Sequence, residues 1–206
     1  MNKETILKAL QELRKLEKRK FVQTAELIIN LRNFDVKKQN VNLFVELPHK
    51  IKEKKVCAFL TKKSALVETI TKAEFGKYEK KVLKKLIKKY DFFISAASLM
   101  PAVATSFGKV LGPAGKMPSP QLGILMTEDD KSLKEVLEKV NKITRIKSKE
   151  PSLKIAIGKE NMKDEEIAEN VIMIYNKVLE ALPRKKENLR SILIKFTMSK
   201  PQKLEY

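Results

Sequence analysis

Apolar residues recur along the chain with two different spacings, and each spacing predicts a different kind of element. In residues 3–18, leucine and isoleucine follow the helical period, so an amphipathic helix is expected. In residues 21–32 and 41–47, apolar and polar residues alternate, which predicts two strands that each bury one face. Between these strands, residues 33–40 ("NFDVKKQN") are expected to form a basic loop that closes a hairpin.

The middle of the chain follows another pattern, in which short continuous apolar runs alternate with helical stretches. The runs "VCAFL", "DFFISAA" and "GILM" are typical of strands that are covered on both faces. Helices are predicted over residues 63–74, 77–89, 98–109 and 130–142. Strands that alternate with helices indicate a parallel sheet with helical crossovers.

From Ile143 onward the alternating pattern returns, so the two chain ends resemble each other more than they resemble the middle. "ITRIKS", a "KEPS" turn and "LKIAIGK" are followed by a helix near 164–182 and a last strand, "SILIKFTM". The predicted fold class is therefore α/β (α+β) with two domains. One domain, with an antiparallel sheet plus helices, is built from residues 1–50 and 144–206, and a βαβ domain at 51–143 is inserted into it.

Charge narrows the choice of partner. The chain of 206 residues has 44 lysines and arginines against 25 acidic residues, a net charge of +19 that favours a polyanion such as nucleic acid. An anionic membrane is the competing partner, but no long helix combines a basic face with tryptophan or phenylalanine anchors. No apolar run approaches the roughly 18 residues that span a bilayer, so a cytoplasmic protein without a membrane partner is expected.

The most basic stretch is "KYEKKVLKKLIKKY". It places Val82, Leu83, Leu86 and Ile87 on one face of a helix and lysines on the other. Such a basic face is ordinarily a solvated surface, and direct contact with RNA is the alternative.

The stretch "SFGKVLGPAGKMPSP", residues 105–119, raises the question of nucleotide binding. A phosphate-binding loop needs a glycine, four residues, Gly-Lys and then a serine or threonine. Val110 stands where that glycine is required before Gly115 and Lys116, and Met117 stands where the hydroxyl is required. We therefore interpret the stretch as a tight turn that joins a helix to a strand, and a nucleotide-dependent enzyme remains only an alternative.

Other residues with catalytic or metal-binding potential occur singly. Cys57 lies in an apolar run and is expected to be a buried thiol. His49 has no second histidine to complete a metal site, and Asp129 and Asp130 are expected to cap a helix. The sequence thus predicts a protein that is not an enzyme, without cofactor or metal.

Three stretches, in order, resemble motifs of one known family. "KFVQTAELIINL" is similar to its Lys-Phe-x-x-Thr-x-Glu strand, "LGPAGKMPSP" to its "LGPRGxMPxP" signature, and "LRSILIKFTMS" to its closing "SVYVKTTMG" strand. The chain thus resembles the universal large-subunit ribosomal protein L-one family, the ribosomal side-stalk protein, in an archaeal-like form.

The resemblance implies both a fold and a function. The inserted domain is expected to be a Rossmann-like three-layer domain, and the terminal domain is expected to bind the stalk region of large-subunit rRNA. The family also implies help in releasing deacylated tRNA from the ribosomal exit site, repression of the protein's own mRNA through its leader, and a monomer when free. A nonspecific polyanion-binding protein remains an alternative.

The resemblance also implies an RNA site on strands from both chain ends. The matching positions are Lys20, Phe21, Thr24, Glu26, Ser191, Thr197, Met198 and Ser199. Side chains on a strand can reach the wide minor groove of RNA, and the hydroxyls of Ser191 and Thr197, six residues apart, are expected to share one face. Lys159, ahead of a predicted helix, is a further candidate for a phosphate contact.

Two positions depart from the family pattern. Ser199 replaces a glycine that would allow close backbone approach to RNA. Ala114 replaces an arginine in the middle loop and removes a planar group with several hydrogen-bond donors.

Overall fold

The chain forms two compact units, each with its own hydrophobic core. In the computed structural model, unit 1 comprises Met1–Lys52 and Lys142–Tyr206, and unit 2 comprises Glu53–Asn141. The expected boundaries, at 50/51 and 143/144, lie two residues from these. The structure describes residues 1–15, 19–36, 39, 41–78, 80–120, 122–148 and 150–205.

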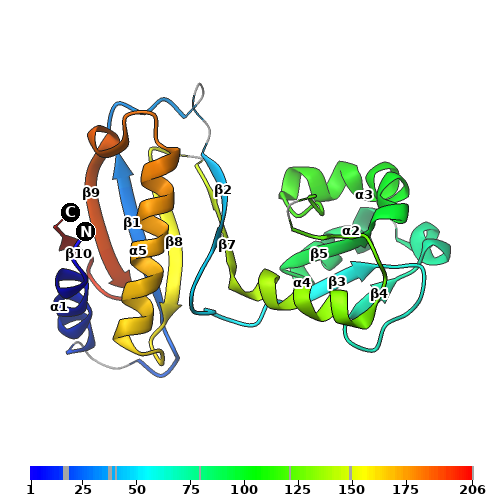
Figure 1. The fold of residues 1–206 in the computed structure, drawn as a ribbon, viewed down its shortest axis with the longest axis horizontal. Helices are drawn as coiled ribbons and strands as arrows, with labels where there is room; N and C mark the ends of the chain where they lie inside the picture. Colours follow the sequence, from blue (N-terminus) through cyan, green and yellow to red (C-terminus); the bar gives the residue numbers. More distant parts are fainter. Residues whose placement is uncertain are drawn as a thin grey trace. The chain divides into compact units, whose positions relative to one another are not determined.

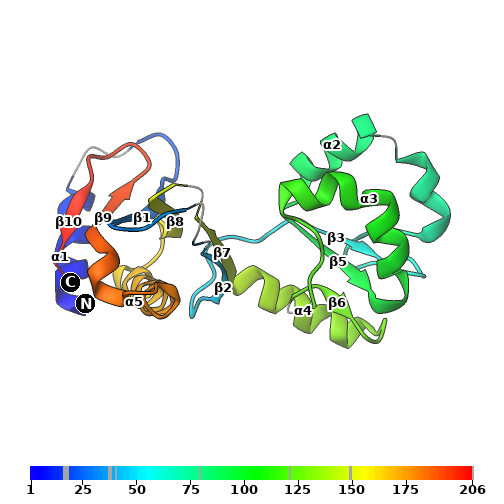
Figure 2. The ribbon, with the colours of Figure 1, turned by 90° about the horizontal axis from the view of Figure 1, so that it is seen from above.

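Unit 1 is an antiparallel sheet with two helices packed on one of its faces (Figures 1 and 2). The strand order is β10-β9-β1-β8, so β1 from the N-terminal segment lies between two strands from the C-terminal segment. Its elements are α1 (Lys3–Arg14), β1 (Thr24–Leu31), β8 (Ser152–Lys159), α5 (Asp164–Ala181), η3 (Lys185–Asn188), β9 (Leu189–Phe196) and β10 (Gln202–Leu204).

Alternation along β1 explains why only one face of this sheet is covered. Ala25, Leu27, Ile29 and Leu31 are buried, and the residues between them are partly exposed. The buried side chains form the core together with the apolar faces of α1 and α5. The predicted helix continues to residue 18, but residues 16–18 lie outside the described residues.

The predicted hairpin between residues 21–32 and 41–47 is wrong. Strand β2 (Asn42–Glu46) pairs with β7 (Ile143–Lys147) in a separate two-stranded ribbon, and β1 pairs with β8 and β9. Strands β7 and β8 likewise follow each other in the chain without pairing, and Lys149 of the predicted "KEPS" turn lies outside the described residues. Alternation shows which side of a strand is buried, but every strand offers the same backbone groups to a partner, so the partner depends on packing over long sequence distances.

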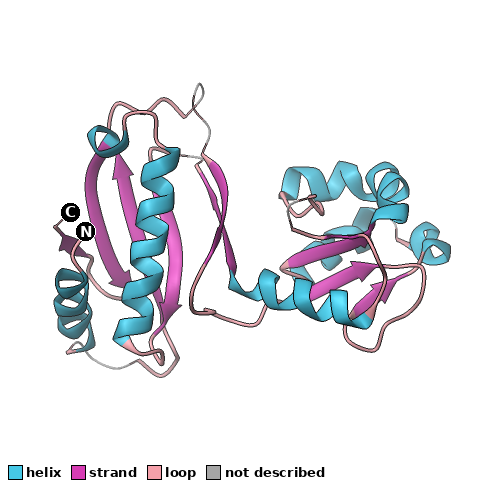
Figure 3. Ribbon diagram, in the orientation of Figure 1, coloured by secondary structure: helices cyan, strands magenta, loops and turns pink. Residues whose placement is uncertain are grey.

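Unit 2 is a parallel sheet in the order β4-β3-β5-β6, with α2 and α3 on one face and α4 on the other (Figures 2 and 3). This arrangement confirms the predicted α/β class. Its core contains a cluster of phenylalanine rings, with 5.0 Å between the ring centroids of Phe59 and Phe107. The elements are β3 (Val56–Phe59), β4 (Glu68–Ile70), η1 (Lys72–Lys77), α2 (Lys80–Lys89), β5 (Phe92–Ala96), η2 (Ala97–Leu99), α3 (Met100–Ala114), β6 (Ile124–Leu125) and α4 (Asp130–Lys142).

Two local predictions in unit 2 are corrected by the structure. Residues 63–74 are not a helix, because β4 pairs in parallel with β3 and a short 3-10 helix follows it. Helix α3 extends past the predicted end at residue 109, since Val103, Phe107 and Leu111 repeat at helical spacing and are buried.

The glycine and proline stretch is a helix end with a structural lysine. Gly115 has a φ of 68°, a left-handed conformation that glycine adopts without a Cβ penalty, and it ends α3. The Lys116 amine donates hydrogen bonds to the carbonyls of Ile87 and Tyr90, each at 2.7 Å. These are carbonyls at and just beyond the C-terminal turn of α2, so the lysine that a phosphate would need is bound within the protein.

Cys57 is fully buried in β3, as expected. Burial, with a smaller contribution from Glu68, raises the pKa of its thiol to about 12. Among the described residues, no helix is long and apolar enough to cross a bilayer, and no group of histidine, cysteine or acidic side chains is arranged to hold a metal ion.

Candidate RNA interface

The antiparallel pairing of unit 1 brings three distant segments to one end of the sheet. Strand β1 begins where β8 and β9 end, with Thr24 opposite Lys159 and Ala25 opposite Phe196. The segments before β1 and after β8 and β9 therefore meet there (Figure 1). Most of the predicted RNA-binding residues lie in this region: Lys20, Phe21, Thr24, Lys159, Thr197, Met198 and Ser199.

Thr24 and Thr197 join the two chain ends directly. The Thr197 amide donates to the Thr24 carbonyl at 3.1 Å, and the Thr24 amide donates to Thr197 Oγ1 at 3.1 Å. The Thr197 hydroxyl also donates to the Thr24 carbonyl at 3.3 Å. The predicted RNA ligand Thr197 therefore has a structural role as well, while remaining at the surface.

Gln23 holds the segment before β1 in place, and sequence reasoning missed it. Its side chain is buried, and its Oε1 accepts a hydrogen bond from the Met198 amide at 3.1 Å. The backbone amide of Gln23 donates to Glu160 Oε2 at 3.1 Å, and the backbone carbonyl of Gln23 accepts from the backbone amide of Glu160 at 2.9 Å. A polar residue beside an exposed aromatic gives no sequence signal of burial, so only the fold shows this role.

The turn after β9 shows how serine replaces the family's glycine. Ser199 Oγ accepts from the Phe196 amide at 2.8 Å, and the Ser199 amide donates to the Phe196 carbonyl at 3.0 Å. Ser199 is not among the described residues with positive φ, so the turn needs no glycine. Met198, within this turn, is 61% exposed.

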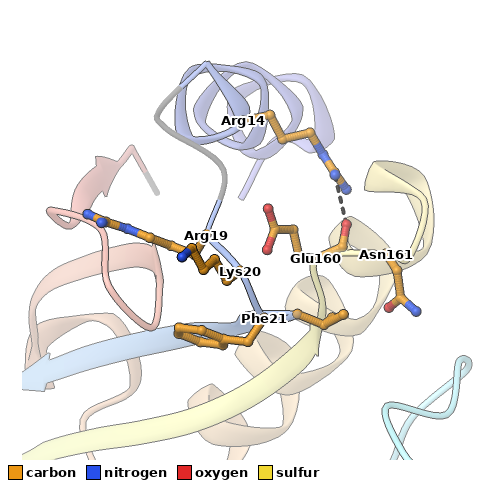
Figure 4. Close-up of a pocket in the computed structure, with 7 residues that line it drawn as sticks. Arg14, Arg19, Lys20, Phe21, Glu160 and Asn161 are labelled. Carbon is orange, nitrogen blue, oxygen red and sulfur yellow. Dashed lines mark hydrogen bonds between the residues drawn. The ribbon is translucent and has the colours of Figure 1, made fainter.

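Exposed apolar side chains lie among cations at this end of the sheet. Phe21 is 53% exposed and Val22 is 52% exposed, values that are high for apolar residues next to a core. They line a cavity of about 420 Å³ together with Arg14, Arg19, Lys20, Glu160 and Asn161 (Figure 4). Aromatic rings beside lysine and arginine are typical of surfaces that stack bases and bind phosphates.

Arg14 forms one wall of this cavity and was not predicted from the sequence. Its guanidinium donates to Asp164 Oδ1 at 2.7 Å, to the Glu160 carbonyl at 2.8 Å and to the Met162 carbonyl at 2.7 Å. Figure 4 shows it reaching toward Glu160, with the Arg19–Phe21 segment on the other side of the cavity. Arg14 therefore fixes α1 to the turn before α5, whereas Arg19 and Lys20 are exposed.

Glu26 and Ser191 lie away from this cluster, on the uncovered face of the sheet. Glu26 is opposite Lys195, which the period of β9 could have identified as a basic residue on this face. Ser191 is near the other end of β9 and accepts from Asn30 Nδ2 at 2.9 Å. Six residues of strand span about 20 Å, so Ser191 and Thr197 share a face but do not meet.

Comparison with known proteins agrees with the motifs. The model of the Ribosomal protein L1p/L10e family matches residues 13–200. The chain is 36% identical to the large ribosomal subunit protein uL1 of Pyrobaculum calidifontis over 221 residues, which cover 100% of this chain and 95% of that protein.

Relatives from other archaea give the same result. The uL1 protein of Methanothermococcus thermolithotrophicus is 34% identical over 100% of both chains. That of Nanoarchaeum equitans is 33% identical over 92% of this chain and 94% of its own length. These proteins are named as ribosomal proteins and not as enzymes, in agreement with the prediction of a non-enzyme. The chain therefore belongs to the Ribosomal protein L1p/L10e family, as its sequence motifs predicted.

Proposed function

We propose that this chain is a large-subunit ribosomal protein of the cytoplasmic ribosome that binds rRNA of the stalk region through unit 1. The contact surface is the end of the sheet where β1 begins and β9 ends, and it continues along the uncovered face toward Ser191. The observation that carries the proposal is the exposure of Phe21 and Val22 beside Arg19 and Lys20, with exposed Met198 lining an adjacent cavity that Arg19 shares. Family membership supports the same function.

Each feature of the surface suits folded RNA. Exposed rings and methionine offer apolar area to unstacked bases or to sugar, and the cations neutralise phosphates. The hydrogen bonds between Thr24 and Thr197, and from Met198 to Gln23, fix this surface before RNA arrives. A preformed surface loses less conformational entropy on binding.

Two finer roles follow from the family resemblance, and we propose them with the rRNA function. The first is help in releasing deacylated tRNA from the exit site as part of the mobile stalk. The second is repression of the protein's own mRNA, whose leader would present an RNA structure like the rRNA site. Competition between the mRNA leader and the rRNA fragment for unit 1 tests the second role.

A pair of double substitutions tests the proposed surface. Phe21→Ala with Met198→Ala removes exposed apolar area at the site, and Leu66→Ala with Met126→Ala removes exposed apolar area from unit 2. Stacking on an aromatic side chain contributes about 1–3 kcal/mol per base, so the first variant is expected to lose roughly tenfold to a hundredfold in affinity.

The assay is filter binding of an rRNA stalk fragment in competition with a scrambled RNA. The unit 2 variant should bind like the parent chain and keep the preference for the stalk fragment. If the Phe21→Ala, Met198→Ala variant keeps full affinity and preference while its circular dichroism is unchanged, the proposed surface is wrong.

A further inference from the structure

We propose that helix α2 of unit 2 is a second RNA-contacting surface, which binds the phosphate backbone of helical RNA. It extends the proposed function to a part of the chain that the family's contact strands do not include. The surface consists of the exposed lysines Lys84, Lys85, Lys88 and Lys89.

The helix has one sign of charge along its whole length. Its sequence, KKVLKKLIKK, contains six lysines in ten residues and no acidic residue. Lys89 pairs with Glu68 at 2.8 Å. In the described part of the chain, no carboxylate pairs with Lys84, Lys85 or Lys88.

Concentrating the lysines in this way opposes helix formation. Side chains three and four residues apart are neighbours on a helix, and like charges at these spacings repel. Among the side chains that the structure describes, the pairs at four-residue spacing are Lys84 with Lys88 and Lys85 with Lys89. A bound polyanion would offset this repulsion by attracting each lysine.

Helix α4 of the same unit shows the ordinary arrangement for a solvated surface. Its sequence, DKSLKEVLEKVNK, alternates lysines with acidic residues. Lys131 and Glu135, and Lys134 and Glu138, stand four residues apart, the spacing at which opposite charges attract. Two amphipathic helices of one unit thus differ in charge pattern, and only α2 is built to attract a polyanion.

The neighbouring contacts hold α2 as a fixed surface. Leu83 and Leu86 are buried in the core of unit 2. Lys116 donates to the carbonyls of Ile87 and Tyr90 and so anchors the C-terminal end of the helix. The lysine row is therefore presented by a helix that is fixed along one face and at one end.

The same contacts favour RNA over other anionic partners. Leu83 and Leu86 of α2 are buried in the core and Ile87 packs against it. Only Val82, 43% exposed, is left to contact a membrane, and one such residue is not the apolar face that an interfacial helix requires. The helix contains no tyrosine, tryptophan or arginine, the residues that dominate protein interfaces. Lysine contacts phosphate as a point charge without a geometric requirement, which suits an RNA backbone of any sequence.

Matched triple substitutions in the full chain test the proposal. Lys84→Gln, Lys85→Gln and Lys88→Gln remove charge from α2. Lys131→Gln, Lys134→Gln and Lys139→Gln remove the same charge from exposed positions of α4. Binding of a mixed-sequence RNA duplex is measured by fluorescence anisotropy between roughly 50 and 200 mM salt.

The slope of log affinity against log salt should be shallower by about 2 to 3 for the α2 variant, since each lost phosphate contact reduces this slope by roughly 0.9. Its affinity at the lower salt should fall at least about tenfold. The α4 variant should keep most of the parent slope. Equal changes in both variants, or none in the α2 variant, would overturn the proposal.

Two further probes separate the possible partners. Vesicles with phosphatidylserine and a polyglutamate peptide are offered to the same variants. If either binds through the α2 lysines as strongly as the RNA duplex does, the assignment to RNA is wrong. Failure of this proposal is distinct from failure of the unit 1 site, because the Phe21→Ala, Met198→Ala variant is judged by preference for the stalk fragment and not by the salt slope.

Discussion

Replacing Lys116 with methionine removes the connection between the loop after α3 and the end of α2. Methionine keeps an unbranched side chain of similar size, so packing changes little. What is lost is an ammonium group that donates to the carbonyls of Ile87 and Tyr90, each at 2.7 Å. Lys109→Met is the matched control, since Lys109 lies exposed on α3, the helix that leads into this loop.

The structure sets the size of the expected effect. A hydrogen bond from a charged group contributes about 1.5–3 kcal/mol, but these two bonds share one ammonium that is partly exposed. A cation at a helix C-terminus adds about 0.3–1 kcal/mol through the helix dipole. We expect Lys116→Met to reduce the free energy of unfolding of unit 2 by about 2–3 kcal/mol, and Lys109→Met to change it by less than about 0.5 kcal/mol.

Cys57 provides an assay that reports on unit 2 alone. It is the only cysteine of the chain, it is fully buried in β3, and burial raises the pKa of its thiol to about 12. An aromatic disulfide reagent therefore reacts only when unit 2 opens. At about 1.4 kcal/mol for each tenfold change, the Lys116→Met chain should react roughly 30 to 150 times faster than the parent chain. Equal rates for the Lys116 and Lys109 variants would refute the structural role of this lysine.

Two other predictions concern the core and the pH dependence of unit 1. Gly158→Ala would place a Cβ 2.8 Å from Ile167 Cγ1 in the core, so thermal unfolding should show a loss of about 1–3 kcal/mol; an unchanged melting temperature would contradict this contact. The hydrogen bond from His49, followed by that from Lys3, lowers the pKa of Glu169 below its ordinary value of 4.5. The resulting stability is present above that value and is lost as pH falls through the lowered pKa, so Glu169→Gln should flatten the fall in stability as the pH drops below 4.5; an unaltered pH profile would contradict it.

The sequence predicted the general architecture because its signals are local. Helix α5 was expected near 164–182 and forms over Asp164–Ala181, since its apolar residues repeat at helical spacing over five turns. The change from alternating to continuous apolar runs indicated an inserted parallel sheet, and the sheet of unit 2 has that arrangement. The motifs in "KFVQTAELIINL" and "LRSILIKFTMS" indicated the family that the comparisons show.

The local signals failed where a short segment is stabilised by a distant one. Residues 63–74 look helical in isolation, but pairing with β3 makes Glu68–Ile70 a strand. The predicted hairpin failed for the same reason. Strand β1 pairs with β8 and β9 of the C-terminal segment, and the face that its alternation marks as apolar is buried with these partners.

For the candidate site, the sequence by itself determined which residues and which kind of partner to consider. The net charge of +19 could be read from the printed chain, and the motifs shared with the family indicated Phe21, Thr24 and Thr197, whereas the exposure of the Phe21 ring came from the structure. Only the tertiary structure decided that Thr24 and Thr197 bond to each other, that Gln23 supports Met198, and that Lys116 serves a helix end. Those outcomes depend on which backbone groups meet after the chain closes on itself, and every residue type offers the same backbone groups, so sequence patterns do not distinguish among the possible partners.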